Sequence, residues 1–205
     1  MRKAIFIDKD GTLIKNVPYN INPRLIKLQP NAGEALKQLQ DESFRIIVVT
    51  NQSGVARGFF AESKLQKVEQ KIKRLLKRCG VELNGFYYCP HLPKDEGSVE
   101  GYCHACRCRK PKPGLLFKAA TMQSIKLKKS WMIGDILNDV EAGNRAGCHT
   151  ILLDNGGETE WMMSPQREPD KTVRNWDKIC KVILNRSNRN IFDSSHRKPT
   201  KTGTI

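Results

Sequence analysis

The stretch Ala4-Ile-Phe-Ile-Asp-Lys-Asp-Gly-Thr12 decides the fold of this chain. Its first four residues are apolar, which is typical of a short strand buried on both faces. Two aspartates, Asp8 and Asp10, follow at once, and Gly11 then turns the chain. Because side chains two residues apart in a strand point to the same side, both carboxylates can converge on one ion or one substrate atom.

Further apolar runs along the chain predict more strands, over residues 45–50, 131–133 and 149–153. Apolar residues at helical spacing predict helices over residues 32–39, 65–76, 115–125, 139–146 and 176–184. Strands that alternate with helices indicate a parallel sheet with helices on both faces. The fold class is therefore α/β, with a Rossmann-like sheet.

Polar residues end three of the predicted strands. Asp8 and Asp10 end the first, Thr50 and Asn51 end the second, and Asp135 follows the third. Ligands of open parallel sheets bind beyond the carboxyl ends of the strands. We therefore expect these side chains to meet in one site.

A carboxylate at the tip of a strand can attack phosphorus and form an aspartyl-phosphate. Nucleophile and phosphate are both anionic, so the site needs the positive charge of Mg²⁺ on Asp8 and Asp135 and of Lys110. Asp10 can donate a proton to the leaving alkoxide and then take one from the attacking water. With Thr50 binding phosphoryl oxygens, these residues predict a phosphatase.

The stretches that carry these residues resemble the motifs of the haloacid dehalogenase (HAD) superfamily of phosphohydrolases. In chain order they are Phe6–Leu13, Val49–Asn51, Lys110, and Gly134 and Asp135 with Asp139. The resemblance covers residues 4–153 and implies a HAD-like fold with Asp8 as nucleophile and Asp10 as acid/base. It also implies Mg²⁺ on Asp8, Asp10 and Asp135, with Asp139 supporting the metal site.

Two longer stretches, residues 50–58 and 89–111, narrow this resemblance. They are similar to the D-glycero-D-manno-heptose 1,7-bisphosphate phosphatases and to the phosphatase domain of histidinol-phosphate phosphatase. The resemblance implies that Arg109 recognises the substrate and that Lys110 stabilises the phosphoryl group. A departure is Ile136, where these relatives often carry a basic residue. The residues expected to bind substrate are Asn16, Val17, Pro18, Tyr19, Thr50, Asn51, Gln52, Ser53, Arg57, Arg109 and Lys110.

Cysteines crowd into residues 87–110, which favours a metal site in a reducing compartment over disulfides. Zinc takes four such ligands, whereas six candidates stand here: Cys89, His91, Cys103, His104, Cys106 and Cys108. The resemblance implies a structural zinc loop with Cys89, His91, Cys106 and Cys108 as ligands. The alternatives are that Cys103 replaces one of these ligands, or that the cysteines are reduced surface residues.

The chain is strongly basic, with 36 Lys and Arg against 21 Asp and Glu and a formal net charge of +15. This excess favours an anionic partner. We expect the substrate to be a small phosphorylated sugar and the protein to be a monomer. A nucleic-acid partner is the less favoured class, either for a polynucleotide 3′-phosphatase on the same scaffold or for a zinc-loop binding module without activity. The intact catalytic set argues against a pure binding module.

We expect one HAD-like domain over residues 1–184, with the zinc loop at about 87–110, followed by a basic, disordered tail over residues 185–205. No apolar run approaches the ~20 residues of a membrane span. The short apolar run before Asp8 is not a signal peptide. Together these features predict a cytoplasmic hydrolase of carbohydrate metabolism, in heptose biosynthesis, with Mg²⁺ and Zn²⁺ as cofactors.

Overall fold

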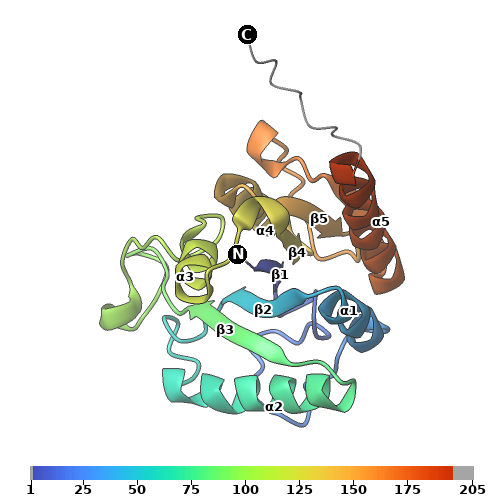
Figure 1. The fold of residues 1–205 in the computed structure, drawn as a ribbon. Helices are drawn as coiled ribbons and strands as arrows, with labels where there is room; N and C mark the ends of the chain where they lie inside the picture. The colour runs from blue at the N-terminus through green and yellow to red at the C-terminus, as the bar shows by residue number, and fades with distance from the viewer. Residues whose placement is uncertain (1, 196–205) are drawn as a thin grey trace.

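The structure is a computed structural model that describes residues 2–195, without the side chains of residues 187–195. At its centre lies a six-stranded sheet in the order β3-β2-β1-β4-β5-β6 (Figure 1), in which every neighbouring pair is parallel. The strands are β1 (Lys3–Ile7), β2 (Phe44–Asn51), β3 (Leu83–Cys89), β4 (Trp131–Gly134), β5 (His149–Leu153) and β6 (Lys171–Val173). The predicted α/β class with a HAD-like parallel sheet is confirmed.

Helices cover both faces of this sheet. They are α1 (Ala32–Asp41), α2 (Leu65–Arg78), α3 (Gly114–Gln123), α4 (Leu137–Ala146) and α5 (Trp176–Ser195). Helices α1, α2 and α5 share one apolar core with the sheet, whereas α3 and α4 pack into a second core on the opposite face. The sheet is thus the middle layer of three.

Strand β1 contributes to both cores because its side chains alternate between the two faces. Ile5 and Ile7 belong to the core under α1, α2 and α5, and Ala4 and Phe6 belong to the core under α3 and α4. All four side chains are fully buried. Such burial on both faces explains why the run that precedes Asp8 is continuously apolar.

Strands β3 and β6 lie outside the apolar runs that predict the other strands. Five of the seven residues of β3 are only half-buried, and the strand contains Asn84 and Gly85. Strand β6 has three residues and is mostly exposed. Both strands lie at the edges of the sheet, where one side has no neighbour, so the sequence carries only a weak apolar signal there.

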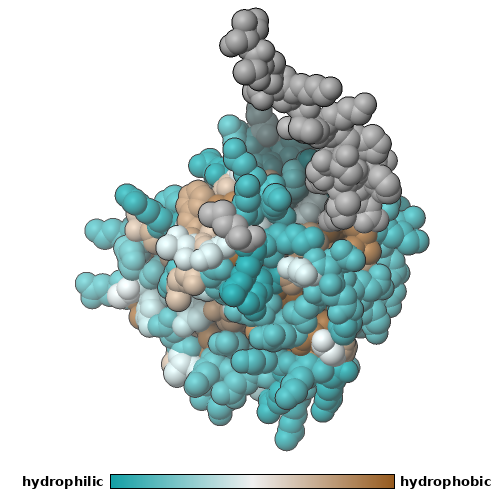
Figure 2. Space-filling view, viewed as in Figure 1, coloured by the Kyte–Doolittle hydropathy of each residue, from teal (hydrophilic) through white to brown (hydrophobic). Residues whose placement is uncertain are grey.

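The last helix, α5, runs to Ser195 and therefore passes the domain boundary expected at residue 184. Residues 185–195 contain neither glycine nor proline, so nothing in this segment interrupts the helical backbone. The rest of the expected tail, residues 196–205, lies outside the described residues. No helix in the described part is long and apolar enough to cross a membrane. The face seen in Figure 2 is largely hydrophilic, with scattered apolar residues.

Candidate active site

The candidate active site begins where β1 ends, at Asp8. Its backbone N–H continues the sheet by donating to the carbonyl of Ile133 at 2.9 Å, which fixes Asp8 beside the end of β4. Gly11 then turns the chain with φ of 79°. A Cβ atom at this position would lie 2.0 Å from Oδ2 of Asp135. Only glycine therefore lets the turn pack this closely against the second carboxylate.

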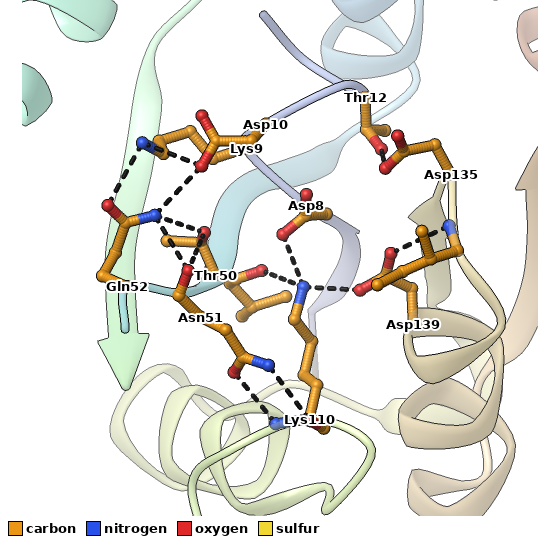
Figure 3. A network of polar contacts seen from close by, with 12 residues as sticks. Asp8, Lys9, Asp10, Thr12, Thr50, Asn51, Gln52, Lys110, Asp135 and Asp139 are labelled. Carbon is orange, nitrogen blue, oxygen red and sulfur yellow. Dashed lines mark hydrogen bonds and ion pairs between the residues drawn. The ribbon is translucent and has the colours of Figure 1, made fainter. Parts of the chain in front are cut away.

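Three buried carboxylates, those of Asp8, Asp135 and Asp139, converge at this point (Figure 3). Each offers an oxygen, and the three oxygens lie within 4.8 Å of one another. Burial raises the pKa of Asp135 to about 6, and the charge of Asp8 adds to this effect. Burial also raises the pKa of Asp139. The raised pKa values show that the ionised form of these carboxyl groups is disfavoured by burial and by their neighbouring carboxylates.

One side chain of opposite charge, Lys110, enters this cluster. Its Nζ donates to Oδ1 of Asp8 and to Oδ1 of Asp139, both at 2.5 Å, and to the carbonyl of Val49 at 3.0 Å. Burial opposes the charged ammonium, but Asp139 and Asp8 together outweigh it and raise the pKa of Lys110. Lys110 is therefore a fixed cation beside the candidate nucleophile.

The backbone of Lys110 is held by Asn51 at the end of β2. The Asn51 side chain accepts from the Lys110 N–H and donates to the Lys110 carbonyl, each at 3.0 Å. This reciprocal pair joins segments that lie 59 residues apart in the chain. Asn51, expected to bind substrate, also lines the cavity described below, but its amide is used to position Lys110.

Asp10 lies on the other side of the site, away from the three converging carboxylates (Figure 3). Its Oδ2 accepts from Lys9 Nζ at 3.0 Å and from Gln52 Nε2 at 3.1 Å. Desolvation raises the pKa of Asp10, and the neighbouring Lys9 ammonium opposes this shift. The two aspartates of the first motif thus sit in different environments, one facing Lys110 and the other facing Lys9.

The chemistry of the carboxylate cluster fits a hard divalent cation such as Mg²⁺. Mg²⁺ prefers oxygen ligands, and the cluster offers carboxylate oxygens from Asp8 and Asp135 with Asp139 behind them. The raised pKa of Asp135 indicates that a nearby positive charge would be stabilising. The Asp10 side chain is directed to Lys9 and Gln52, so its backbone carbonyl is the part of Asp10 that remains for a metal.

A cavity of about 240 Å³ opens beside Asp10. Six of the residues expected to bind substrate line it, together with Asp10, Gly54 and Phe60. These six are Asn16, Pro18, Tyr19, Asn51, Gln52 and Ser53. Thr50 is buried behind them and accepts a hydrogen bond from Gln52 at 3.0 Å.

Five residues expected to bind substrate do not line this cavity: Val17, Thr50, Arg57, Arg109 and Lys110. The guanidinium groups of Arg57 and Arg109 are turned to backbone carbonyls of the Cys/His loop. Arg57 donates to Glu96 at 3.3 Å, and Arg109 donates to His91 at 3.4 Å. Arg109 lines a neighbouring cavity of about 470 Å³ instead. Long hydrogen bonds of this kind hold a side chain weakly.

The Cys/His loop gathers four of its six candidate zinc ligands at one point. They are Cys89, His91, Cys106 and Cys108, whose ligand atoms lie within 4.8 Å of one another. The Sγ atoms of Cys89 and Cys106 are 3.6 Å apart, and Nδ1 of His91 is 3.3 Å from Sγ of Cys108. Burial raises the pKa of the Cys89 thiol. Tetrahedral zinc, with bonds of about 2.0–2.3 Å, fits ligand atoms at such separations.

The two remaining candidates of this loop lie outside the cluster. Cys103 contacts the carbonyl of Ala56 at 3.8 Å. The centre of the His104 ring lies 4.3 Å from the centre of the His91 ring, and the two rings are tilted against each other. This placement supports the ligand set implied by the resemblance over the alternative that includes Cys103.

Sequence reasoning missed four residues that build the site. Lys9 touches Asp10 as described, and Thr12 donates its hydroxyl to Oδ1 of Asp135 at 2.8 Å. Asn155 donates to the carbonyl of Gly11 at 2.7 Å. Glu158 accepts from the first backbone N–H of α4 at 2.6 Å. Asn155 and Glu158 follow β5, another strand whose carboxyl end meets this edge, and that position is the signal that could have indicated them.

Comparisons with known proteins agree with this site. Residues 107–178 match the HAD-hydrolase-like family model. The chain is 41% identical over 155 residues to a D-glycero-beta-D-manno-heptose-1,7-bisphosphate 7-phosphatase of Haemophilus ducreyi, covering 74% of this chain and 82% of that protein. The chain belongs to the haloacid dehalogenase superfamily of phosphatases.

Two further relatives place the chain within this superfamily. The protein of the same name from Escherichia coli K12 is 39% identical over 152 residues, which cover 73% of this chain and 78% of that protein. The solved D,D-heptose 1,7-bisphosphate phosphatase of B. bronchiseptica, in complex with magnesium and phosphate, superposes with a TM-score of 0.71. It is 26% identical and covers 90% of this chain and 99% of that one. The expected HAD phosphohydrolase class is thereby confirmed.

Proposed function

We propose that this phosphatase hydrolyses one phosphate of D-glycero-D-manno-heptose 1,7-bisphosphate, the 7-phosphate, through an aspartyl-phosphate. The observation that carries the proposal is the separation of the two aspartates of the first motif. Asp8 meets Lys110, Asp135 and Asp139, whereas Asp10 faces the cavity. This division provides a nucleophile and an acid/base on opposite sides of the position for the phosphoryl group. The choice of substrate rests on the names of relatives about 40% identical to this chain.

In the proposed reaction, an oxygen of Asp8 attacks phosphorus while the bond from phosphorus to the sugar oxygen breaks. Asp10 donates its proton to that leaving oxygen. Asp10 then takes a proton from water as the water attacks phosphorus, and the bond to Asp8 breaks to release inorganic phosphate. Lys110 and Thr50 stabilise the phosphoryl oxygens throughout.

We assign the Mg²⁺ site to Asp8, Asp135 and the backbone carbonyl of Asp10, with Asp139 in support. When bound, this ion neutralises charge that develops on the phosphoryl oxygens. Asp139 also holds the ammonium of Lys110, so its role is shared between the metal site and the lysine. We assign a structural Zn²⁺ to Cys89, His91, Cys106 and Cys108, where four protein ligands leave no open position for catalysis.

The size of the cavity beside Asp10 supports a small substrate. A volume of about 240 Å³ accommodates part of a sugar phosphate but not a folded polymer. Asn51, which lines this cavity, is hydrogen-bonded to Lys110 at the end of the zinc loop, and Arg57 and Arg109 donate to carbonyls of that loop. We propose that these guanidinium groups contact the second phosphate or the sugar hydroxyls after leaving those weak hydrogen bonds.

The test is a turnover screen with three substrates: heptose 1,7-bisphosphate, histidinol phosphate and a 3′-phosphorylated oligonucleotide. We expect the highest kcat/KM for the heptose bisphosphate, with release of one phosphate per molecule. Faster turnover of histidinol phosphate would reassign the enzyme to that reaction. Preference for the oligonucleotide would show that the +15 charge serves nucleic-acid recognition.

A further inference from the structure

We propose that Lys9 and Gln52 form a clamp that positions Asp10, so that one defined oxygen of Asp10 exchanges the proton in catalysis. This inference rests on the proposed function of Asp10 as acid/base and deepens it. Neither Lys9 nor Gln52 is itself placed on the reacting phosphoryl group. Both are therefore positioning residues.

The first observation is that both donors bind the same oxygen of Asp10. Lys9 Nζ lies 3.0 Å from Oδ2, and Gln52 Nε2 lies 3.1 Å from Oδ2. Among the described residues, no side chain or backbone group donates to Oδ1. Two donors on one oxygen fix the rotation of the carboxyl group. Oδ1 is thereby left to carry the proton that Asp10 gives up and takes back.

The second observation is that the clamp is itself rigid. Lys9 Nζ donates to Oε1 of Gln52 at 3.2 Å, so Lys9, Gln52 and Asp10 form a closed triangle of contacts. The Gln52 amide nitrogen also lies 3.0 Å from Oγ1 of Thr50 and 3.0 Å from the carbonyl of Asn51, so its two N–H groups are shared among three acceptors. Every polar atom of the Gln52 side chain therefore has a protein partner.

The third observation is the burial of Lys9, which is 1% exposed. Burying an ammonium group is costly, and an ion pair repays that cost only partly, so an apolar residue of similar length would serve packing at least as well. Of the two flanking aspartates, Asp8 pairs with Lys110, whereas the cationic partner of Asp10 is Lys9 itself. The buried lysine is thus the charged partner of the carboxylate that is proposed to exchange the proton, as a positioning role requires.

The test compares leaving groups, because p-nitrophenolate leaves without a proton and a sugar alkoxide does not. We expect Lys9→Met to lower kcat/KM for the heptose bisphosphate by about 10- to 100-fold, and for p-nitrophenyl phosphate by less than about threefold. Hydrolysis of the phosphoenzyme still needs Asp10 as a base. The variant should therefore release p-nitrophenolate in a burst before a slow steady state.

Four further variants make the test specific. Lys9→Arg keeps a donor to Asp10. It should therefore restore most of the kcat/KM for the heptose bisphosphate relative to that for p-nitrophenyl phosphate. Lys9→Met added to Asp10→Asn should cause no further loss, because the group that is positioned has already been removed. Lys37→Met removes a lysine that pairs with Asp41 on the exposed surface of α1. This variant should leave kcat/KM unchanged for both substrates. Gln52→Leu should resemble Lys9→Met.

Equal losses on both substrates, or no rescue by Lys9→Arg, would overturn the clamp. Circular dichroism and zinc content would establish that each variant is folded, and a misfolded Lys9→Met would be replaced by Gln52→Leu. Inactivity of the unmodified enzyme on the heptose bisphosphate would instead reject the proposed substrate. The clamp would then be tested on whichever alkyl phosphate the enzyme hydrolyses, so the two failures can be told apart.

Discussion

The part of the chain that the structure describes contains two clusters of side chains suited to metals, and they are built in opposite ways. The carboxylate cluster joins Asp8, at the end of β1, to Asp135 and Asp139, which lie far along the chain where β4 leads into α4. The cysteine/histidine cluster draws its residues from one segment, residues 89–108. Sheet pairing holds the first in place, whereas the second lies in a loop with few regular elements. We therefore expect the first to survive loss of its ion and the second to depend on it.

The largest expected effect comes from removing the nucleophile. Asp8→Asn should lower kcat by at least about 10³-fold, because the covalent step has no substitute. Zinc content should stay unchanged, because the two clusters are independent. Steady-state phosphate release and elemental analysis would measure both. Asp41→Asn, on the exposed surface of α1, is the matched control; near-normal turnover by Asp8→Asn would exclude the proposed mechanism.

Zinc removal should have the next largest effect and should act on folding as well as on turnover. We expect one Zn²⁺ per chain that persists through dialysis, whereas Mg²⁺ is removed and restored freely. Cys106→Ser should lose zinc and melt at a lower temperature. Cys103→Ser should keep both zinc and stability because its Sγ lies outside the cluster. Full zinc and full stability in Cys106→Ser would contradict this ligand set.

Substitution of Arg109 tests whether this residue of the zinc loop contacts the sugar or the second phosphate of the substrate. Arg109→Ala should lower kcat/KM for a sugar bisphosphate more than for an aryl phosphate, by about 1–3 kcal/mol if a charged hydrogen bond is lost. Arg107→Ala, between two candidate ligands, is the matched control and should affect neither substrate. Equal losses on both substrates would show that Arg109 acts only through its hydrogen bond to the carbonyl of His91.

The smallest expected effect is on the pH dependence of stability. The pKa of Asp135 is about 6 in the folded protein, above the ~3.9 of an unfolded chain. The folded state therefore binds more protons between these values, and the free energy of unfolding falls as pH rises from about 4 to about 6. Mg²⁺ binds the ionised carboxyl and should raise the melting temperature more at about pH 7.5 than at about pH 5. An equal gain at both values, or a gain that persists in Asp135→Asn, would contradict this assignment.

Much of the fold was determined by the sequence alone. Strands β1, β2, β4 and β5 each contain an apolar run because both of their faces are buried, and this pattern is readable without coordinates. The edge strands β3 and β6 could not be predicted in this way, because a half-exposed strand needs fewer apolar residues. Helix α5 continues beyond the apolar residues that predict it, because a helix needs no buried side chain to extend by a few turns.

The candidate site divides in the same way. The residue types and their order predicted Asp8, Asp10, Lys110 and Asp135 as site residues because phosphoryl transfer requires carboxylates and a cation at strand ends. The geometry of the clamp around Asp10 was decided only by tertiary structure. Lys9 and Gln52 are 43 residues apart, and sheet pairing of β1 with β2 is what brings them together. Local sequence carries no record of such a contact, since the partner on the next strand is chosen by the fold.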